Sequence, residues 1–240
     1  MALRENYERV LERVREAELR AGRQPGEVRL MAVTKTIEEP VIAEAIAAGA
    51  RLLGENKVQE LVRKRSALFS EVPDETAVSL GRNCELHLIG HLQSNKAAKA
   101  VACADMIQSV DSVRIAREIS KECAKQGSQM PVLLEVNIGR DPAKFGFLPE
   151  DTQAALDEIA AFPGIIVRGL MTVPPFLQED CQTRKFFSQM FRLFLDIRAK
   201  NRDNIDILSM GMSGDYELAI AEGANLVRVG SAIFGERIYR

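Results

Sequence analysis

The 240-residue sequence contains no tryptophan, only two histidines and four cysteines. Cys84, Cys103, Cys123 and Cys181 are far apart and form no C-x-x-C pair. Two histidines without such a pair make a zinc site improbable, and scattered cysteines do not form a disulfide framework. We therefore expect no metal site, and we expect reduced thiols of the kind found in the cytosol.

An excess of charge of one sign is also absent, because 32 Lys and Arg residues face 34 Asp and Glu residues, for a formal charge of -2. Nucleic-acid-binding proteins normally carry a strongly basic patch, so nucleic acid is not an expected partner. No apolar run approaches the roughly 20 residues needed to span a bilayer. The mixed charges of residues 1–9 are unlike a secretory signal or an organellar transit peptide. We expect a cytoplasmic protein that does not bind membranes.

The sequence repeats one pattern along its length: a short apolar run, a polar loop and an amphipathic helical segment. Most of the runs are too continuous for strands with one exposed face, which is typical of a parallel sheet covered by helices. There are eight of them, at residues 28–33, 51–54, 86–90, 106–110, 132–138, 165–172, 207–212 and 226–233. Eight strands alternating with helices in about 250 residues predict a (β/α)₈ barrel of the TIM type, in the α/β class.

A doubly wound open sheet is the alternative fold. It would normally have fewer strands and often has a glycine-rich first βα turn, whereas residues 33–36 (VTKT) contain no glycine. The chain also has no Pro/Gly/Ser-rich linker, low-complexity tract or charge block. We therefore expect one domain over residues 1–240, with residues 1–22 as an extra N-terminal helix outside the repeat.

In a barrel of this kind, functional residues lie where the strands end and the βα loops begin. Lys35 directly follows the first apolar run, which would bring it to the barrel mouth. Partial burial there would lower the pKa of the amine and leave it neutral enough to act as a Schiff-base nucleophile. The alternative is a strand-end lysine that reaches solvent or pairs with an acid, and position alone does not exclude it.

The last two runs have the features of an anion site. Barrels often bind phosphate with the loops after strands seven and eight, through backbone N–H groups and small hydroxyl residues. Ser213-Gly214 and Gly230-Ser231 occupy those positions, and the glycines would let the backbone approach a ligand closely. Two such pairs favour a phosphate site over ordinary turns.

Polar residues are also expected inside the barrel. Arg228 lies within the last apolar run, where it should donate to a ligand's ring nitrogen or phosphate, or pair with Glu135 or Asp215. His87 alternates with leucines and is expected to point inward as a hydrogen-bonded core histidine. Polar side chains in residues 91–96 are expected to line the mouth.

Seven stretches resemble the pyridoxal phosphate homeostasis protein family. They are residues 32–35 (AVTK), 54–56 (GEN), 87–96 (HLIGHLQSNK), 144–147 (KFGF), 169–172 (GLMT), 208–215 (LSMGMSGD) and 227–235 (VRVGSAIFG). The similarity extends from the first expected strand to the C-terminus, and the two longest stretches are too specific for chance agreement. The resemblance implies a barrel similar to the N-terminal domain of alanine racemase, with pyridoxal 5'-phosphate held as a Schiff base on Lys35.

The same resemblance implies which residues surround the cofactor. They are Lys35, Asn56, Met212, Ser213, Arg228, Gly230 and Ser231. The two serines and Gly230 would hold the phosphate with Met212 beside them, Arg228 would face the pyridine nitrogen, and Asn56 would lie near the cofactor. Position 231 is often threonine in the family, and serine retains the hydroxyl.

The family is thought to buffer and deliver the cofactor and so to affect amino-acid and keto-acid balance, without robust catalysis. An arginine cannot stabilise a protonated pyridine nitrogen as an aspartate does, so the ring would be a weak electron sink. The expected partners are pyridoxal phosphate and the apo-enzymes that receive it, and the expected state is a monomer.

Two alternatives remain at this point. One is a pyridoxal-phosphate-dependent, racemase-like enzyme acting on an amino acid. It is disfavoured because alanine racemases take their second acid/base, a tyrosine, from a C-terminal domain that we do not expect here. The other is a phosphate-ester barrel enzyme in which Lys35 forms its Schiff base with the substrate.

Overall fold

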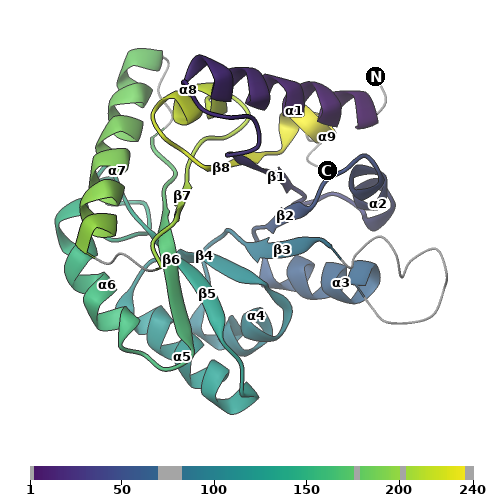
Figure 1. The fold of residues 1–240 in the computed structure, drawn as a ribbon. Helices are drawn as coiled ribbons and strands as arrows, with labels where there is room; N and C mark the ends of the chain where they lie inside the picture. The colour runs from purple at the N-terminus through teal and green to yellow at the C-terminus, as the bar shows by residue number, and fades with distance from the viewer. Residues whose placement is uncertain (1–2, 70–82, 176–178, 201–203, 236–240) are drawn as a thin grey trace.

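The computed structural model describes residues 3–69, 83–175, 179–200 and 204–235. Within them, eight strands form a closed barrel in which every neighbouring pair is parallel and β8 returns to β1 (Figure 1). The strands are β1 (Arg29–Val33), β2 (Leu52–Glu55), β3 (Glu85–Leu88), β4 (Met106–Val110), β5 (Met130–Glu135), β6 (Ile165–Met171), β7 (Ile207–Ser209) and β8 (Leu226–Val229). The (β/α)₈ barrel predicted from the sequence is confirmed, and the open-sheet alternative is excluded.

Helices alternate with the strands and surround the barrel (Figure 1). They are α1 (Leu3–Arg20), α2 (Glu39–Ala47), α3 (Val58–Phe69), α4 (Ala97–Cys103), α5 (Val113–Gln126), α6 (Thr152–Ala160), α7 (Asp180–Lys200), α8 (Tyr216–Ala221) and α9 (Ser231–Phe234), with short 3-10 helices at η1 (Ser94–Lys96) and η2 (Pro149–Asp151). Helix α1 precedes the first strand and packs against α8 and α9. Helix α1 covers most of residues 1–22, the stretch predicted as an extra N-terminal helix, and residues 1 and 2 lie outside the described part. That residues 1–240 form one domain stays a prediction.

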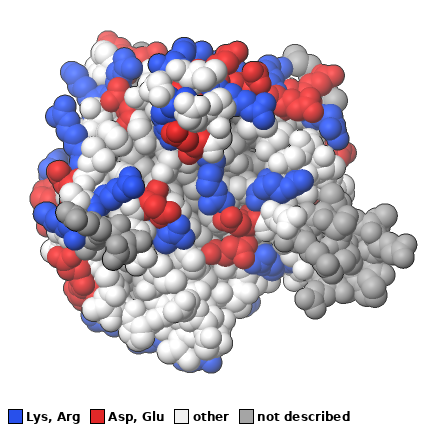
Figure 2. Space-filling model, in the orientation of Figure 1, with Lys and Arg blue, Asp and Glu red and all other residues white. Residues whose placement is uncertain are grey.

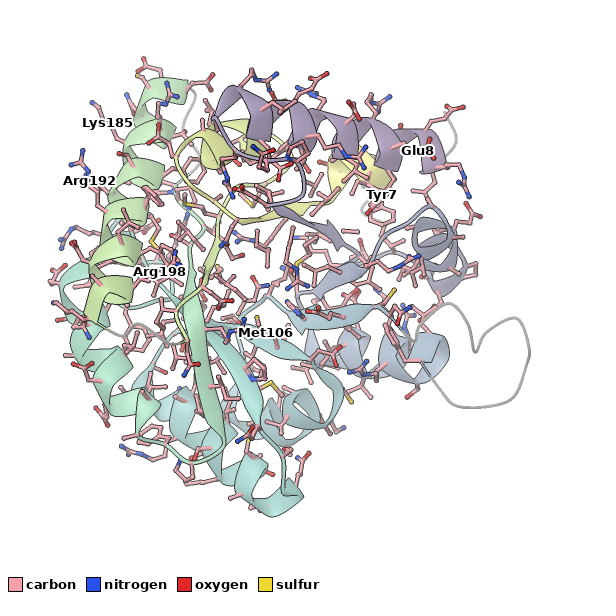
Figure 3. All side chains as sticks on the ribbon, viewed as in Figure 1. Tyr7, Glu8, Met106, Lys185, Arg192 and Arg198 are labelled. Carbon is pink, nitrogen blue, oxygen red and sulfur yellow. The ribbon has the colours of Figure 1, made fainter. Side chains whose placement is uncertain are left out.

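Alternate residues of each strand face opposite sides of the barrel wall. Met31 and Val33 of β1 belong to a small apolar cluster to which nearly every strand contributes, and this cluster fills the barrel interior. Met106 of β4, labelled in Figure 3, is another member. Leu30 and Ala32 instead belong to the larger core between the strands and the helices. Since Lys35 has the same parity as Met31 and Val33, the strand directs it to the barrel mouth.

The loop after β5 makes that strand shorter than the apolar run 132–138 predicts. The backbone folds back so that the N–H of Phe147 donates to the carbonyl of Glu135 at 2.8 Å, and the N–H of Asn137 donates to the carbonyl of Phe147 at 2.9 Å. Gly146 makes this possible with a φ of +111°, and a Cβ added there would lie 2.8 Å from the Asn137 nitrogen. The apolar run 226–233 also gives a shorter strand than expected. Strand β8 ends at Val229, and helix α9 begins at Ser231.

In the part of the chain that the structure describes, neither a membrane-spanning helix nor a disulfide is found. No helix there combines the length and apolarity needed to cross a bilayer. Figure 3 shows Lys185, Arg192 and Arg198 along α7, where all three are exposed. On the face shown in Figure 2, basic and acidic side chains are interspersed. None of the four cysteines forms a disulfide.

Candidate functional site

A cavity of about 680 Å³ lies at the C-terminal ends of the strands. Its lining comes from the ends of β1 and β8, from the residues that follow β1, β2, β3, β5, β6, β7 and β8, and from the first turn of α7. This is the end of a (β/α)₈ barrel at which active sites are found. The size is within the usual range for a pocket that holds a small molecule or cofactor.

All seven residues expected at the cofactor line this one cavity. They are Lys35, Asn56, Met212, Ser213, Arg228, Gly230 and Ser231. They come from four different strand ends, so the barrel brings together residues that are up to about 200 positions apart in the chain. The structure adds neighbours that the sequence did not single out for the site, among them Ile89, Asp180 and Thr183.

Side chains of α3 are hydrogen-bonded to the backbone of the turn that carries Lys35. Lys64 Nζ donates to the carbonyl of Thr34 at 2.7 Å, and Glu60 accepts the backbone N–H of Thr36 at 2.7 Å. Thr36 has a φ of +65°, which is uncommon for a residue other than glycine. The backbone on both sides of the half-buried Lys35 is therefore fixed by hydrogen bonds to one helix.

A buried ion pair lies at the centre of this network. Lys64 and Glu55 both have side chains with 0% exposure, and Lys64 Nζ lies 2.8 Å from Glu55 Oε1. The hydroxyl of Thr34 donates to the same carboxylate oxygen. Burial raises the pKa of Glu55 above its usual range despite these contacts, which favour the ionised form. From sequence, Glu60 and Lys64 look like an ordinary i,i+4 surface pair, so this network was missed.

The loops after β7 and β8 meet at the hydroxyl of Ser213. Its oxygen accepts the backbone N–H groups of Gly230 at 3.1 Å and Ala232 at 3.5 Å. A Cβ added at Gly214 would meet no atom within 4 Å, so the loop leaves open space there. Ser231, the first residue of α9, is exposed beside them. This corner of the cavity, called the amide corner below, offers backbone N–H and hydroxyl donors.

Asp215 fixes the loop after β7. Its carboxylate accepts the backbone N–H of Met212 at 2.6 Å. Burial raises the pKa of Asp215, although that hydrogen bond favours the ionised form.

Arg228 lies at the base of the cavity and is 4% exposed. Its Nη1 donates to Ser209 Oγ at 2.6 Å and its Nη2 to the carbonyl of Thr172 at 2.8 Å. Burial lowers the pKa of Arg228 to about 10, and the charges of Glu135 and Asp215 act in the opposite direction. The direct ion pair with one of these carboxylates, expected as an alternative, does not form.

Residues 91–96 are not part of the cavity lining, whereas Ile89, which directly follows β3, belongs to it. His91 Nδ1 lies 2.6 Å from Asp111 Oδ2, and its ring stacks on Phe145 with centroids 3.7 Å apart. These contacts engage the ring with the end of β4 and with the loop after β5. Residues 91–96 therefore do not line this cavity, and their place at the barrel mouth stays a prediction. His87 is buried and hydrogen-bonded inside the barrel, as predicted.

Known proteins share both the sequence and the fold. The profile of the family described as "Alanine racemase, N-terminal domain" matches residues 2–238. A protein of Aquifex aeolicus named pyridoxal phosphate homeostasis protein is 37% identical over 235 residues, which is 98% of each chain. This chain belongs to the pyridoxal phosphate homeostasis protein family. The resemblance inferred from the sequence motifs is confirmed.

Solved structures agree with membership of the homeostasis family. The structure of PipY from Synechococcus elongatus with PLP bound is 35% identical to this chain, with a TM-score of 0.78 over 94% of this chain and 100% of that chain. Alanine racemase of Clostridium difficile gives a TM-score of 0.67 at 14% identity, over 95% of this chain and 57% of that one. The second likeness shows the barrel fold alone.

Proposed function

We propose that this member of the homeostasis family binds pyridoxal 5'-phosphate as a Schiff base on Lys35 and keeps the cofactor available inside the cell. The observation that supports the proposal is that Lys35, the amide corner and Arg228 line a single cavity. The bound cofactor would supply an aldehyde, which a lysine amine binds covalently and reversibly. The PLP-bound state of the PipY relative supports the same assignment.

The residues present fit the chemistry of the cofactor. A phosphate group needs several N–H and O–H donors that can approach closely. The amide corner has the hydroxyls of Ser213 and Ser231 in the cavity lining, and the backbone N–H groups of Gly230 and Ala232, which here donate to the Ser213 oxygen. Open space at Gly214 allows a phosphate oxygen to approach the backbone there. In this proposal Ser213, Gly230 and Ser231 hold the phosphate, with Met212 beside them.

Arg228 and Asn56 are assigned to contacts with the rest of the cofactor, which includes its pyridine ring. A guanidinium only donates hydrogen bonds, so Arg228 facing the pyridine nitrogen favours its unprotonated form. Such a ring withdraws electrons weakly, which argues for a carrier rather than a robust catalyst. Asn56 lines the cavity just after β2 and is assigned to a contact with the cofactor. We further propose that the protein is a cytoplasmic monomer that passes the cofactor to apo-enzymes and so affects amino-acid and keto-acid balance.

The first experiment records the absorbance spectrum with added pyridoxal phosphate, followed by borohydride reduction and peptide mapping. We expect a yellow band and one reduced adduct, on the peptide that contains Lys35. Lys35→Ala should lose both and keep its thermal stability, because the side chain lies at the mouth. Lys57→Ala is the matched control, since Lys57 is an exposed lysine outside the cavity lining, and it should keep both signals.

Two results would contradict the proposal. A single adduct on another lysine in Lys35→Ala would refute the anchor. Amino-acid turnover that is robust in the native protein and absent in Lys35→Ala would refute the carrier role and favour the racemase-like enzyme.

A further inference from the structure

A continuous chain of hydrogen bonds crosses the barrel interior from Arg228 to the opposite end of the barrel. Arg228 Nη1 lies 2.6 Å from Ser209 Oγ, and Ser209 Oγ lies 2.7 Å from Gln108 Oε1. Gln108 Nε2 then lies 2.9 Å from His87 Nδ1, and His87 Nε2 lies 2.9 Å from Glu85 Oε2. Five side chains from strands β3, β4, β7 and β8 are thereby linked.

The chain runs along the barrel axis from the cavity to the N-terminal ends of the strands. Ser209, Gln108 and His87 are fully buried, with 0% exposure. Glu85 is the first residue of β3 and has a side chain that is 47% exposed, and there it pairs with Arg29, the first residue of β1, at 2.7 Å. The chain therefore joins a residue at the base of the cavity to a partly exposed ion pair at the far end of the barrel.

With the Gln108 oxygen placed towards Ser209 and its nitrogen towards His87, the chemistry of the groups fixes the direction of every bond. Arginine only donates, so the Ser209 oxygen accepts from it and the Ser209 hydrogen is directed to Gln108 Oε1. The amide nitrogen of Gln108 also only donates, so His87 Nδ1 accepts and His87 must carry its proton on Nε2, which donates to the Glu85 carboxylate. Each donor thus points away from Arg228 and towards Glu85, an arrangement in which successive bonds polarise one another.

The electrostatics agree with that direction. Burial lowers the pKa of His87 from its usual value of 6.5, so the neutral ring is favoured. The hydrogen bond from His87, together with Arg29, lowers the pKa of Glu85 to about 2. A neutral Nε2–H imidazole that donates to an ionised carboxylate agrees with both shifts.

We propose that Ser209, Gln108 and His87 are positioning residues that fix the Arg228 guanidinium beneath the cavity and couple it to Glu85. Arg228 makes two hydrogen bonds, and Ser209 is the only side chain among their acceptors in the described part of the structure. Because the Ser209 hydroxyl is itself held by Gln108, the chain sets the orientation of the guanidinium. This inference rests on the proposed function only in taking a bound ligand to contact Arg228.

The first test needs no ligand and so is independent of the proposed function. The protein has only two histidines, so its imidazole ¹⁵N spectrum is simple. The resonances that remain in His91→Gln belong to His87. At pH 7 we expect His87 to be neutral and protonated on Nε2. We also expect Gln108→Met, which keeps the length of the side chain but removes its polar atoms, to shift the His87 Nδ1 resonance. A proton on Nδ1 at pH 7 would overturn the proposed direction of the chain.

The second test measures coupling to the cavity. Gln108→Met should weaken pyridoxal phosphate binding about tenfold, the order expected for losing buried hydrogen bonds, and should shift the pH at which the visible band titrates. Thr152→Val is the control. It removes a hydrogen bond of similar length, 2.9 Å, from a fully buried side chain on α6, and it should lower stability without moving the affinity or the titration.

A double-mutant cycle separates coupling through the chain from general damage. Glu85→Gln at the exposed end should weaken binding a few-fold in the native background and should have no effect in Gln108→Met. Additive effects, or an effect of Thr152→Val equal to that of Gln108→Met, would refute the positioning role. If the native protein failed to bind pyridoxal phosphate, the proposed function would be refuted. The imidazole spectra would still show whether the hydrogen bonds run in the proposed direction from Arg228 to Glu85.

Discussion

Replacing Glu135 by glutamine should stabilise the protein at alkaline pH and do much less at acidic pH. Glu135 is the last residue of β5 and lies near the barrel mouth. Burial and the nearby Asp111 carboxylate raise its pKa from 4.5 to about 7, and the opposing charges of Arg228 and Lys144 do not compensate. Glutamine has nearly the same shape without the charge, so the substitution removes this unfavourable ionisation.

The sign and size follow from linkage between folding and protonation. In the unfolded chain Glu135 ionises near pH 4.5, whereas in the folded protein it stays protonated up to about pH 7. Stability therefore falls as the pH rises through this window, and the full penalty is present above pH 7. A shift of this size corresponds to about 3 kcal/mol at pH 8 and about 1 kcal/mol at pH 5. Glu135→Gln should recover amounts of that order at each pH.

Urea unfolding of both proteins at pH 5 and pH 8 measures the effect. Glu118→Gln on α5 is the control, because the partly exposed Glu118 has a pKa lowered by its hydrogen bond with Lys121. Removing that charge should bring no gain at pH 8. A Glu135→Gln protein that is less stable than the native one at pH 8, or equally stabilised at both pH values, would refute the electrostatic account of this residue.

Three further changes test other parts of the site. Lys64→Met should lower the free energy of unfolding in urea by about 3 kcal/mol, because it leaves the Glu55 carboxylate buried without its ion-pair partner. Adding Glu55→Gln should recover part of that loss, and a loss below about 1 kcal/mol would contradict the prediction. Gly146→Ala should cost about 2 kcal/mol or more because the backbone there has a positive φ and no space for a Cβ; an unchanged melting temperature would show that the loop relaxes. Replacing Ser213 and Ser231 together by alanine should weaken binding of pyridoxal phosphate but not of pyridoxal, and equal affinity for pyridoxal phosphate before and after the change would exclude the amide corner as the phosphate site.

Most of the fold could be predicted because each strand carries its own signal. A strand buried on both faces is mostly apolar, and eight such runs separated by amphipathic helices leave few arrangements. The position of Lys35 follows from the same pattern, since the parity of β1 directs it to the mouth. The amide corner could also be anticipated, because serine and glycine stand at the ends of the two strands where barrels bind phosphate.

The buried polar contacts could not be predicted, because they depend on which strands face each other across the barrel. Ser209 and Gln108 are hydrogen-bonded although they are 101 positions apart. Nothing local distinguishes Gln108 from a polar residue at the edge of a strand. Lys64 looks like a solvated helix residue, yet it has no exposed surface. Contacts of this kind become visible only when the closed barrel fixes the register of every strand.

Two charged side chains occupy inward positions on the strands near the cavity. Arg228 and Glu135 occupy inward positions on β8 and β5, whereas Leu226 and Leu133, two residues earlier on the same strands, belong to the apolar interior cluster. Burial lowers the pKa of Arg228 and raises the pKa of Glu135, so it disfavours the charged form of both side chains. Placing these charges inside the barrel therefore does not stabilise the fold. Apolar residues at these positions would stabilise the fold at least as well. The placement of Arg228 is therefore explained by what it presents to the cavity, and the apolar clusters carry the stability of the barrel.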